Sequence, residues 1–201
     1  MNDGTVFIVD DDQGLLGSLE LLLGSVGLDV RSFKSPNDFL NSYQRCAGCV
    51  LIDDRMPEMT GLALQTELVK RGIPLSVVLM TGFADANRTA RAFKEGAVDF
   101  IEKPFQPEEL IDVVKGALER GCEVFREDEE SHEFHAKLAS LTPRERDVFD
   151  QLLTGKPNKL MADALEISDR TIEVHRARVM KKMGGDSVAE LVRLATRFIA
   201  S

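Results

Sequence analysis

Five short runs rich in aliphatic, β-branched and aromatic residues recur between residues 5 and 101: "TVFIVD", "LDVRSF", "CVLID", "LSVVLM" and "AVDFI". The stretches between them carry apolar residues three and four positions apart, which is the spacing of a helix. Uninterrupted apolar runs such as residues 77–80 suit parallel strands that are covered on both faces. The alternation therefore predicts an α/β domain built as a doubly wound (βα)5 sheet.

Polar side chains gather where these predicted strands end. Ligands bind outside the carboxyl ends of the strands in an open parallel sheet, so these side chains should meet. They are Asp10, Asp11 and Asp12 after the first run, Asp53 in the third, Thr81 after the fourth and Lys103 after the fifth. Carboxylates this close would repel each other unless a cation lay among them, and an oxygen-rich site with access to water suits Mg²⁺. The charges thus predict a metal site.

Such a site can accept a phosphoryl group. With Mg²⁺ or Mn²⁺ bound, one carboxylate can attack the phosphorus while Thr81 and Lys103 stabilise the phosphoryl oxygens. Asp53 and Asp54 are adjacent, and neighbouring side chains of a strand point to opposite faces. The strand pattern alone therefore leaves both of them as candidates for the acceptor.

Four motifs in order, "VDDD", "IDDRMPEMTG", "MTG" and "DFIEKPF", resemble the receiver domain of two-component response regulators of the FixJ/NarL branch. The resemblance covers residues 5–120 and implies a flavodoxin-like fold. It implies that Asp53, three residues before Met56, accepts the phosphoryl group from a sensor histidine kinase. The other roles that it implies are Asp10, Asp11, Asp53 and the backbone carbonyl of Arg55 as metal ligands, Thr81 and Lys103 as phosphate contacts, Thr81 and Phe100 as switch residues, and a cis Lys103-Pro104 bond.

The same resemblance implies a homodimer in the phosphorylated state. Its surface would comprise residues 84–95, 97–101 and 107–120. Charged residues of both signs on that surface could pair across a two-fold axis. They are Arg88, Arg91, Lys94, Glu108 and Asp112.

The chain changes character after about residue 120. Residues 1–137 hold 14 Lys and Arg against 25 Asp and Glu, whereas residues 138–201 hold 11 against 9. The stretch 121–137 is charged and weakly periodic, as a solvated helix or linker would be. We therefore expect a first domain over residues 1–120, a linker over 121–137 and a smaller, mildly basic domain over 138–201.

The last part of the chain carries helical signals. Thr142, Pro143 and Glu145 form the start of a helix with a capping box, and Ser168 is the expected N-cap of a later helix. Two helices joined by a short turn make a helix-turn-helix, so the second domain should be all-α. On its third helix, Ile172, Val179 and Met183 mark the buried stripe by their spacing, and most charged residues must face outward.

The motifs "LTPRE", "NKLMA" and "TIEVHR" resemble the LuxR/GerE-type DNA-binding domain over residues 138–198. The resemblance implies that residues 168–182 enter the major groove of promoter double-stranded DNA. Residues nearest the bases would be Glu173, Val174, Arg176 and Arg178, and those nearer phosphates Lys159, Lys181 and Lys182. Ser168, Arg170 and Thr171 complete the expected contact set.

Two other function classes remain open. An aspartate-based, Mg²⁺-dependent phosphohydrolase would use a nucleophilic Asp, a Thr and a Lys, but "DDDQG" fits its expected D-x-D motif poorly. A metal-sensing or redox-sensing regulator could use Cys46 and Cys49, with His132 and His135 as further ligands. Cys49 falls on an apolar predicted strand, however, where a thiol usually acts as a small hydrophobe.

No stretch of the chain approaches the roughly 20 apolar residues of a membrane helix. The first ten residues, "MNDGTVFIVD", lack the charged-then-apolar order of a signal peptide. Three cysteines suit a reducing compartment better than a disulfide framework. We therefore expect a cytoplasmic, phosphorylation-dependent transcription regulator that is not an enzyme.

Overall fold

The computed structural model describes residues 4–82 and 99–199. The chain separates into two compact units, Met1–Asp128 and Glu129–Ser201, and the boundary between them falls within the stretch 121–137. Within the described ranges, no helix combines the length and the apolar character needed to cross a bilayer. Each unit is described below by itself.

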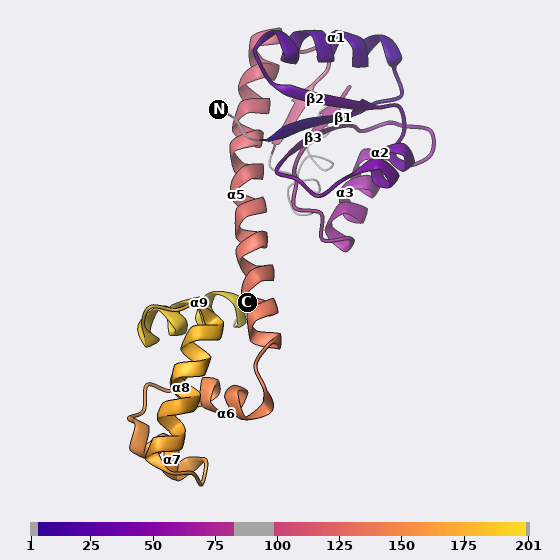
Figure 1. Ribbon diagram of the computed structural model, residues 1–201. Helices are drawn as coiled ribbons and strands as arrows, with labels where there is room; N and C mark the ends of the chain where they lie inside the picture. Colours follow the sequence, from indigo (N-terminus) through magenta and orange to yellow (C-terminus); the bar gives the residue numbers. More distant parts are fainter. Residues whose placement is uncertain (1–3, 83–98, 200–201) are drawn as a thin grey trace. The chain divides into compact units, whose positions relative to one another are not determined.

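A five-stranded parallel sheet forms the centre of the first unit, with strand order β2-β1-β3-β4-β5 (Figure 1). Its strands are β1 (Thr5–Val9), β2 (Asp29–Phe33), β3 (Gly48–Asp53), β4 (Ser76–Thr81) and β5 (Asp99–Glu102). The order reverses between β1 and β3, since the chain passes from β1 to β2 on one side and returns to the other. The predicted doubly wound α/β sheet is confirmed.

Helices cover both faces of this sheet (Figure 1). The helices α1 (Gln13–Ser25) and α5 (Pro107–Ala139) bury Leu19 and Leu118 against one face, and α2 (Pro36–Ser42) and α3 (Gly61–Lys70) bury Phe39 and Leu64 against the other. Every residue of β1 is buried, because alternate side chains enter opposite layers of the core. Polar residues lie at the carboxyl ends of these strands, with Asp10 directly after β1, Asp53 at the end of β3 and Thr81 at the end of β4.

Helix α5 runs through the whole stretch 121–137. In the first unit, a Cβ on Gly121 would lie 1.8 Å from the carbonyl oxygen of Gly48, so only glycine allows this close approach. Arg45 forms an ion pair with Asp128 and lies over the ring of Phe125, 5.4 Å from its centroid. The charged stretch is therefore a helix that these contacts fix on the first unit up to Asp128.

The second unit packs the last turns of α5 with α6 (Pro143–Leu153), α7 (Asn158–Ala164), α8 (Asp169–Met183) and α9 (Val188–Ile199). The predicted capping box is present: the Thr142 hydroxyl accepts from the backbone N–H of Glu145, whose carboxylate accepts from the N–H of Thr142. Glu166, in the turn between α7 and α8, has a φ of 55°. The predicted all-α domain and the N-cap at Ser168 are confirmed.

Candidate functional site

The ammonium group of Lys103 joins two carboxylates at the carboxyl edge of the sheet. Its Nζ lies 2.7 Å from Oδ2 of Asp10 and 2.5 Å from Oδ1 of Asp53. Asp10 follows β1, Asp53 ends β3, and both are buried, with 1% and 9% of their surfaces exposed. These are the strands between which the order reverses, so residues 10, 53 and 103 meet where the sequence places a ligand site.

Backbone groups hold these side chains in place. The N–H of Arg55 donates to Oδ2 of Asp53 at 2.7 Å, and the N–H of Asp12 donates to Oδ1 of Asp10 at 2.9 Å. Lys103 donates its own N–H to the carbonyl of Thr81 at 2.7 Å, and the Lys103-Pro104 bond is cis, as expected. Backbone N–H groups thus orient the carboxylates of Asp10 and Asp53, and the bond to Thr81 fixes the backbone at Lys103.

The environment keeps Lys103 charged. Burial by itself would lower the pKa of this ammonium group, but its hydrogen bonds to Asp10 and Asp53 outweigh that effect and raise the pKa above the ordinary value. One positive charge therefore faces two carboxylates. The remaining negative charge allows a second cation to bind at the same edge.

The donor set fits Mg²⁺ with water. Among the residues that the structure describes, no three Asp, Glu, His or Cys side chains form a metal-binding group. Mg²⁺ is commonly held by one or two carboxylates together with water and phosphate oxygens, and Asp10 and Asp53 supply two such carboxylates. Asp11 is exposed in the turn that follows β1.

The structure distinguishes Asp53 from Asp54. The carboxylate of Asp53 binds Lys103, whereas the backbone N–H of Asp54 donates to the carbonyl of Met80 at 2.9 Å and extends the pairing of β3 with β4. Asp54 is also buried, with 6% of its surface exposed. Asp53 is therefore the carboxylate that shares a site with Asp10 and Lys103.

Gly61 is a site residue that the sequence pattern did not reveal. A Cβ at this position would lie 2.6 Å from the carbonyl oxygen of Asp53 and 3.0 Å from the Cα of Asp54. The side chain of any larger residue would clash with the end of β3 and push the start of α3 away from it. The signal that could have found it is the glycine at the first position of a helix, where a better helix former would otherwise be expected.

The expected switch residues have different surroundings. Thr81 ends β4 and is half-buried, and its carbonyl accepts the bond from Lys103. Phe100 is half-buried in β5 and packs against the core beneath α2 and α3. Of the expected dimer surface, Glu108 and Asp112 are exposed on α5. Residues 84–95 and 97–98, with Arg88, Arg91 and Lys94, lie outside the described residues.

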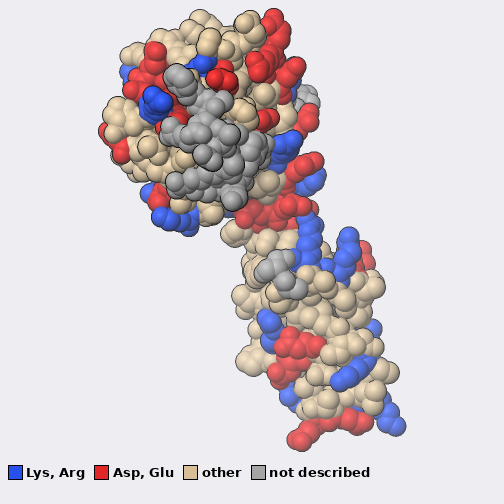
Figure 2. Space-filling model, turned by 180° about the vertical axis from the view of Figure 1, so that it is seen from behind, with Lys and Arg blue, Asp and Glu red and all other residues tan. Residues whose placement is uncertain are grey.

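In the second unit, α8 buries the predicted stripe. Ile172 and Val179 have no exposed surface and Met183 has 3%. The exposed members of the expected DNA-contact set lie on α7, at the N-cap of α8 and along α8: Lys159, Ser168, Arg170, Glu173, Val174, Arg178 and Lys181. On the face seen in Figure 2, basic and acidic side chains are interspersed over this unit. The exposed side chains at the start of α7, at the N-cap of α8 and along α8 therefore define the candidate interface.

Three expected DNA contacts are partly enclosed instead. The ammonium of Lys182, predicted to lie near a phosphate, binds Oε2 of Glu145 at 2.6 Å and the carbonyl of Ser140 at 3.0 Å. The guanidinium of Arg176 donates to Oδ1 of Asn158 at 2.7 Å. Thr171 is half-buried, and its hydroxyl lies 2.7 Å from that of Ser168. Helical spacing predicted that these side chains face outward, and it gave no sign of their partners within the same unit.

The three cysteines differ in burial: Cys49 is buried, whereas Cys46 and Cys122 are half-buried. All three are free thiols, and Cys49 is fully buried in β3. Burial, reinforced by the nearby Cys122, raises the pKa of the Cys49 thiol to about 12. A thiolate is the form that binds metal or reacts, so Cys49 is unsuited to the sensing role considered for Cys46 and Cys49.

Comparisons with known proteins cover both units. Residues 6–115 match the family model described as "Response regulator receiver domain", and residues 139–195 match "Bacterial regulatory proteins, luxR family". The transcriptional regulatory protein TdiR of Thauera aromatica is 39% identical over 98% of this chain and 87% of its own length. The transcriptional regulatory protein FixJ of Bradyrhizobium diazoefficiens is 40% identical over 96% of this chain and 95% of its own.

Solved structures give the same result. The response regulator StyR is 34% identical, with a TM-score of 0.82 over 98% of this chain and 100% of that chain. Full-length FixJ from B. japonicum is 38% identical, with a TM-score of 0.58 over the whole of both chains. The similarity therefore extends over both compact units.

Proposed function

The chain belongs to the response regulators that join a receiver domain to a LuxR-type DNA-binding domain, and from this we propose that phosphorylation of Asp53 controls its binding to DNA. Proteins of this family regulate transcription in two-component systems, and they are regulators rather than enzymes. A receiver domain implies a sensor kinase as the phosphodonor. The phosphohydrolase alternative is therefore set aside.

The observation that carries the proposal is the contact of Lys103 with both Asp10 and Asp53. In the transfer, a carboxylate oxygen of Asp53 forms a bond to phosphorus as the bond from phosphorus to the donor histidine nitrogen breaks. The Lys103 ammonium, which already binds Asp53, is placed to stabilise the phosphoryl oxygens, and the Thr81 hydroxyl is proposed to bind another. The N–H of Arg55 fixes the acceptor by its bond to the second carboxylate oxygen.

Magnesium is proposed to act at the same edge. Asp10, Asp11, Asp53 and the backbone carbonyl of Arg55 would hold Mg²⁺ or Mn²⁺, which supplies positive charge to the transferring phosphoryl oxygens. Asp10 is buried and oriented by the N–H of Asp12, so it is preorganised for a cation. Lys103 and the metal ion would together balance the carboxylates and the added phosphate.

The effect of phosphorylation is proposed to be a dimer that binds promoter DNA. The phosphoryl group adds about −1.5 to −2 charge beside Thr81, and rearrangement of Thr81 and Phe100 would alter the surface that includes α5 residues 107–120. The residues proposed to contact DNA are Lys159, Ser168, Arg170, Thr171, Glu173, Val174, Arg176, Arg178 and Lys181. Among these, exposed Arg178 and Lys181 suit base and phosphate contacts respectively.

Labelling with a small-molecule phosphodonor tests the acceptor. In the presence of Mg²⁺, the protein should gain one acid-stable, base-labile phosphoryl group. Asp53→Asn should abolish labelling, and Asp54→Asn is the matched control that should retain it. A chelator should stop the reaction. Labelling that survives Asp53→Asn but is lost in Asp54→Asn would overturn the assignment, and labelling that survives chelation would overturn the metal role.

A further inference from the structure

A charged network holds the C-terminal end of α8. The ammonium of Lys182 binds the Glu145 carboxylate at the start of α6, at 2.6 Å, and the carbonyl of Ser140 just after α5, at 3.0 Å. Only 5% of the Glu145 side chain is exposed, compared with 36% for Lys182. The Lys182 side chain therefore connects α8 to the start of α6 and to the residue that follows α5.

Glu145 cannot easily release this cation. Its Oε2 also accepts from the backbone N–H of Thr142 at 2.9 Å, which fixes the carboxylate in the capping box. A buried carboxylate that loses its cationic partner keeps an uncompensated charge, which is costly. Turning Lys182 outward to a DNA phosphate would therefore require breaking an internal pair, whereas its neighbour Lys181 is already exposed.

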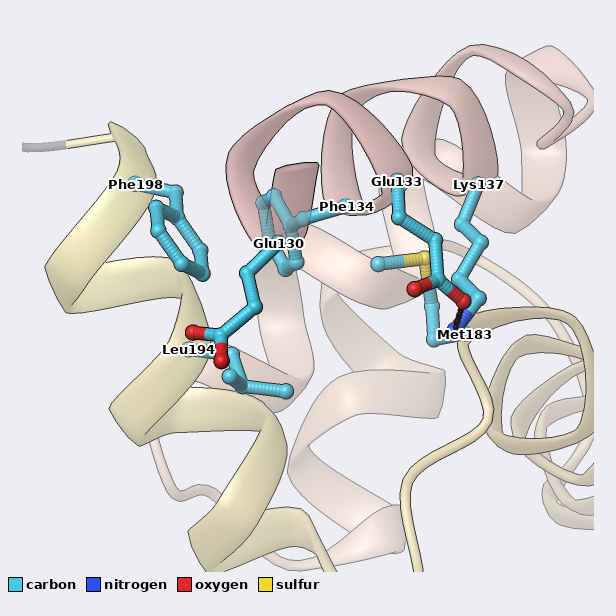
Figure 3. A pocket seen from close by; sticks show the side chains of 7 residues that line it. All are labelled: Glu130, Glu133, Phe134, Lys137, Met183, Leu194 and Phe198. Carbon is cyan, nitrogen blue, oxygen red and sulfur yellow. Dashed lines mark ion pairs between the residues drawn. The ribbon is translucent and has the colours of Figure 1, made fainter. Parts of the chain in front are cut away.

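The last turns of α5 contact the same end of α8. Met183 and Phe134 line one pocket together with Lys137, Leu194 and Phe198 (Figure 3). Gly184, the C-cap of α8, has a φ of 70°, and a Cβ there would lie 3.3 Å from Nζ of Lys137. The C-terminal end of α8 therefore contacts α5, α6 and α9, so a shift of any of these three helices would move α8.

From this geometry we propose that Lys182 is a positioning residue, which sets the direction of α8 for base recognition and does not neutralise a DNA phosphate. Arg178 lies one helical turn before Lys182 and shares a face with it. Hydrogen bonds to base edges tolerate little displacement, whereas attraction to phosphates does not depend on sequence. Loss of the anchor should therefore reduce sequence discrimination more than general affinity. The inference rests on the proposed role of α8 in reading DNA.

The test uses the full-length phosphorylated protein and two duplexes of equal length. One is selected by the wild-type protein from a random-sequence library, and the other is unrelated. Lys182→Met should weaken binding to the selected duplex at least tenfold and to the unrelated duplex less than twofold, with an unchanged salt dependence. Lys181→Ala, the matched control, should weaken binding to both and lower the slope of log K against log salt by about 0.9, which is one counterion. Lys182→Arg should restore most of the discrimination.

If Lys182→Met does not fold, Glu145→Gln provides a second test of the same role. Glu145 is buried and cannot reach DNA, so a positioning role predicts the same loss of discrimination, and the double variant should lose no more than either single one. A phosphate role for Lys182 predicts instead an equal loss on both duplexes and a smaller salt slope for Lys182→Met, and unchanged discrimination for Glu145→Gln. Either that result or unchanged binding by both variants would overturn the proposal. A wild-type protein that selects no sequence would contradict the proposed function itself.

Discussion

Replacement of Phe134 by alanine should strongly destabilise the DNA-binding unit. Phe134 belongs to α5, yet its ring is buried, with 4% exposed, in the core formed with α6, α8 and α9. Its centroid lies 5.5 Å from that of Phe198. The last turns of the long helix therefore act as part of this small domain.

The size of the effect follows from this burial. Truncation of a buried phenylalanine to alanine costs about 3–5 kcal/mol, through lost apolar burial and the cavity that remains. A small domain loses about 4–8 °C in Tm per kcal/mol, so the expected fall is at least about 12 °C. Small domains have little stability in reserve, so the substituted unit should be largely unfolded near physiological temperature.

Thermal unfolding of matched fragments provides the assay. Residues 129–201 should unfold cooperatively, while Phe134→Ala in that fragment and the shorter fragment 138–201 should both melt at much lower temperature. Val174→Ala is the control, since Val174 is 45% exposed and its truncation should change stability by less than about 0.5 kcal/mol. If fragment 138–201 is as stable as fragment 129–201, the end of α5 does not belong to this core and the reasoning fails.

Three further predictions concern other contacts. Glu166→Gly should raise the Tm of the same unit by a few degrees, because Glu166 has a φ of 55° that costs an L-residue about 1 kcal/mol; a fall in Tm would show that its side chain contributes more than the strain costs. Hydrogen bonds from Lys182 and from the backbone N–H of Thr142 lower the pKa of Glu145 from 4.5 to about 2, so the stabilisation they give is present above pH 4.5 and is lost as the pH falls toward 2. The difference in Tm between wild type and Glu145→Gln should therefore shrink over that range, and a constant difference would count against the ion pair. Arg45→Ala should speed amide hydrogen exchange in residues 121–128 of α5, because it removes the contact with Asp128, whereas the exposed-pair control Arg71→Ala should leave that exchange unchanged.

The sheet and its reactive edge could be predicted because their signals are local. Apolar runs define the strands, and a parallel sheet places their carboxyl ends together, so residues 10, 53 and 103 had to meet. The choice between Asp53 and Asp54 could not be predicted from these local signals. Strand alternation leaves both possible, and only the family motif and then the bond from Lys103 to Asp53 separate them.

The roles of individual charged residues in the second unit could not be read in the same way. Helical spacing predicts that Arg176 and Lys182 lie off the buried stripe, but it contains no information on which other helix approaches that face. Asn158 and Glu145 come from α7 and α6, and they reach these cations only after the domain has packed. Likewise, the charged composition of residues 121–137 indicated a solvated helix or a linker but not its packing contacts, since isolated apolar residues such as Phe125 and Phe134 make them.

The proposed control of DNA binding by phosphorylation of Asp53 predicts that DNA affinity differs before and after phosphorylation. The duplex is one selected by the wild-type protein, and protein concentrations span the expected dimerisation. Phosphorylated wild type should sediment as a dimer and bind at least tenfold more tightly than the unphosphorylated protein, which is a difference of about 1.4 kcal/mol. Asp53→Asn, treated with the same phosphodonor, should bind like the unphosphorylated protein. Equal affinity of wild type in both states, or a gain of affinity by Asp53→Asn after treatment, would show that phosphorylation of Asp53 does not control DNA binding.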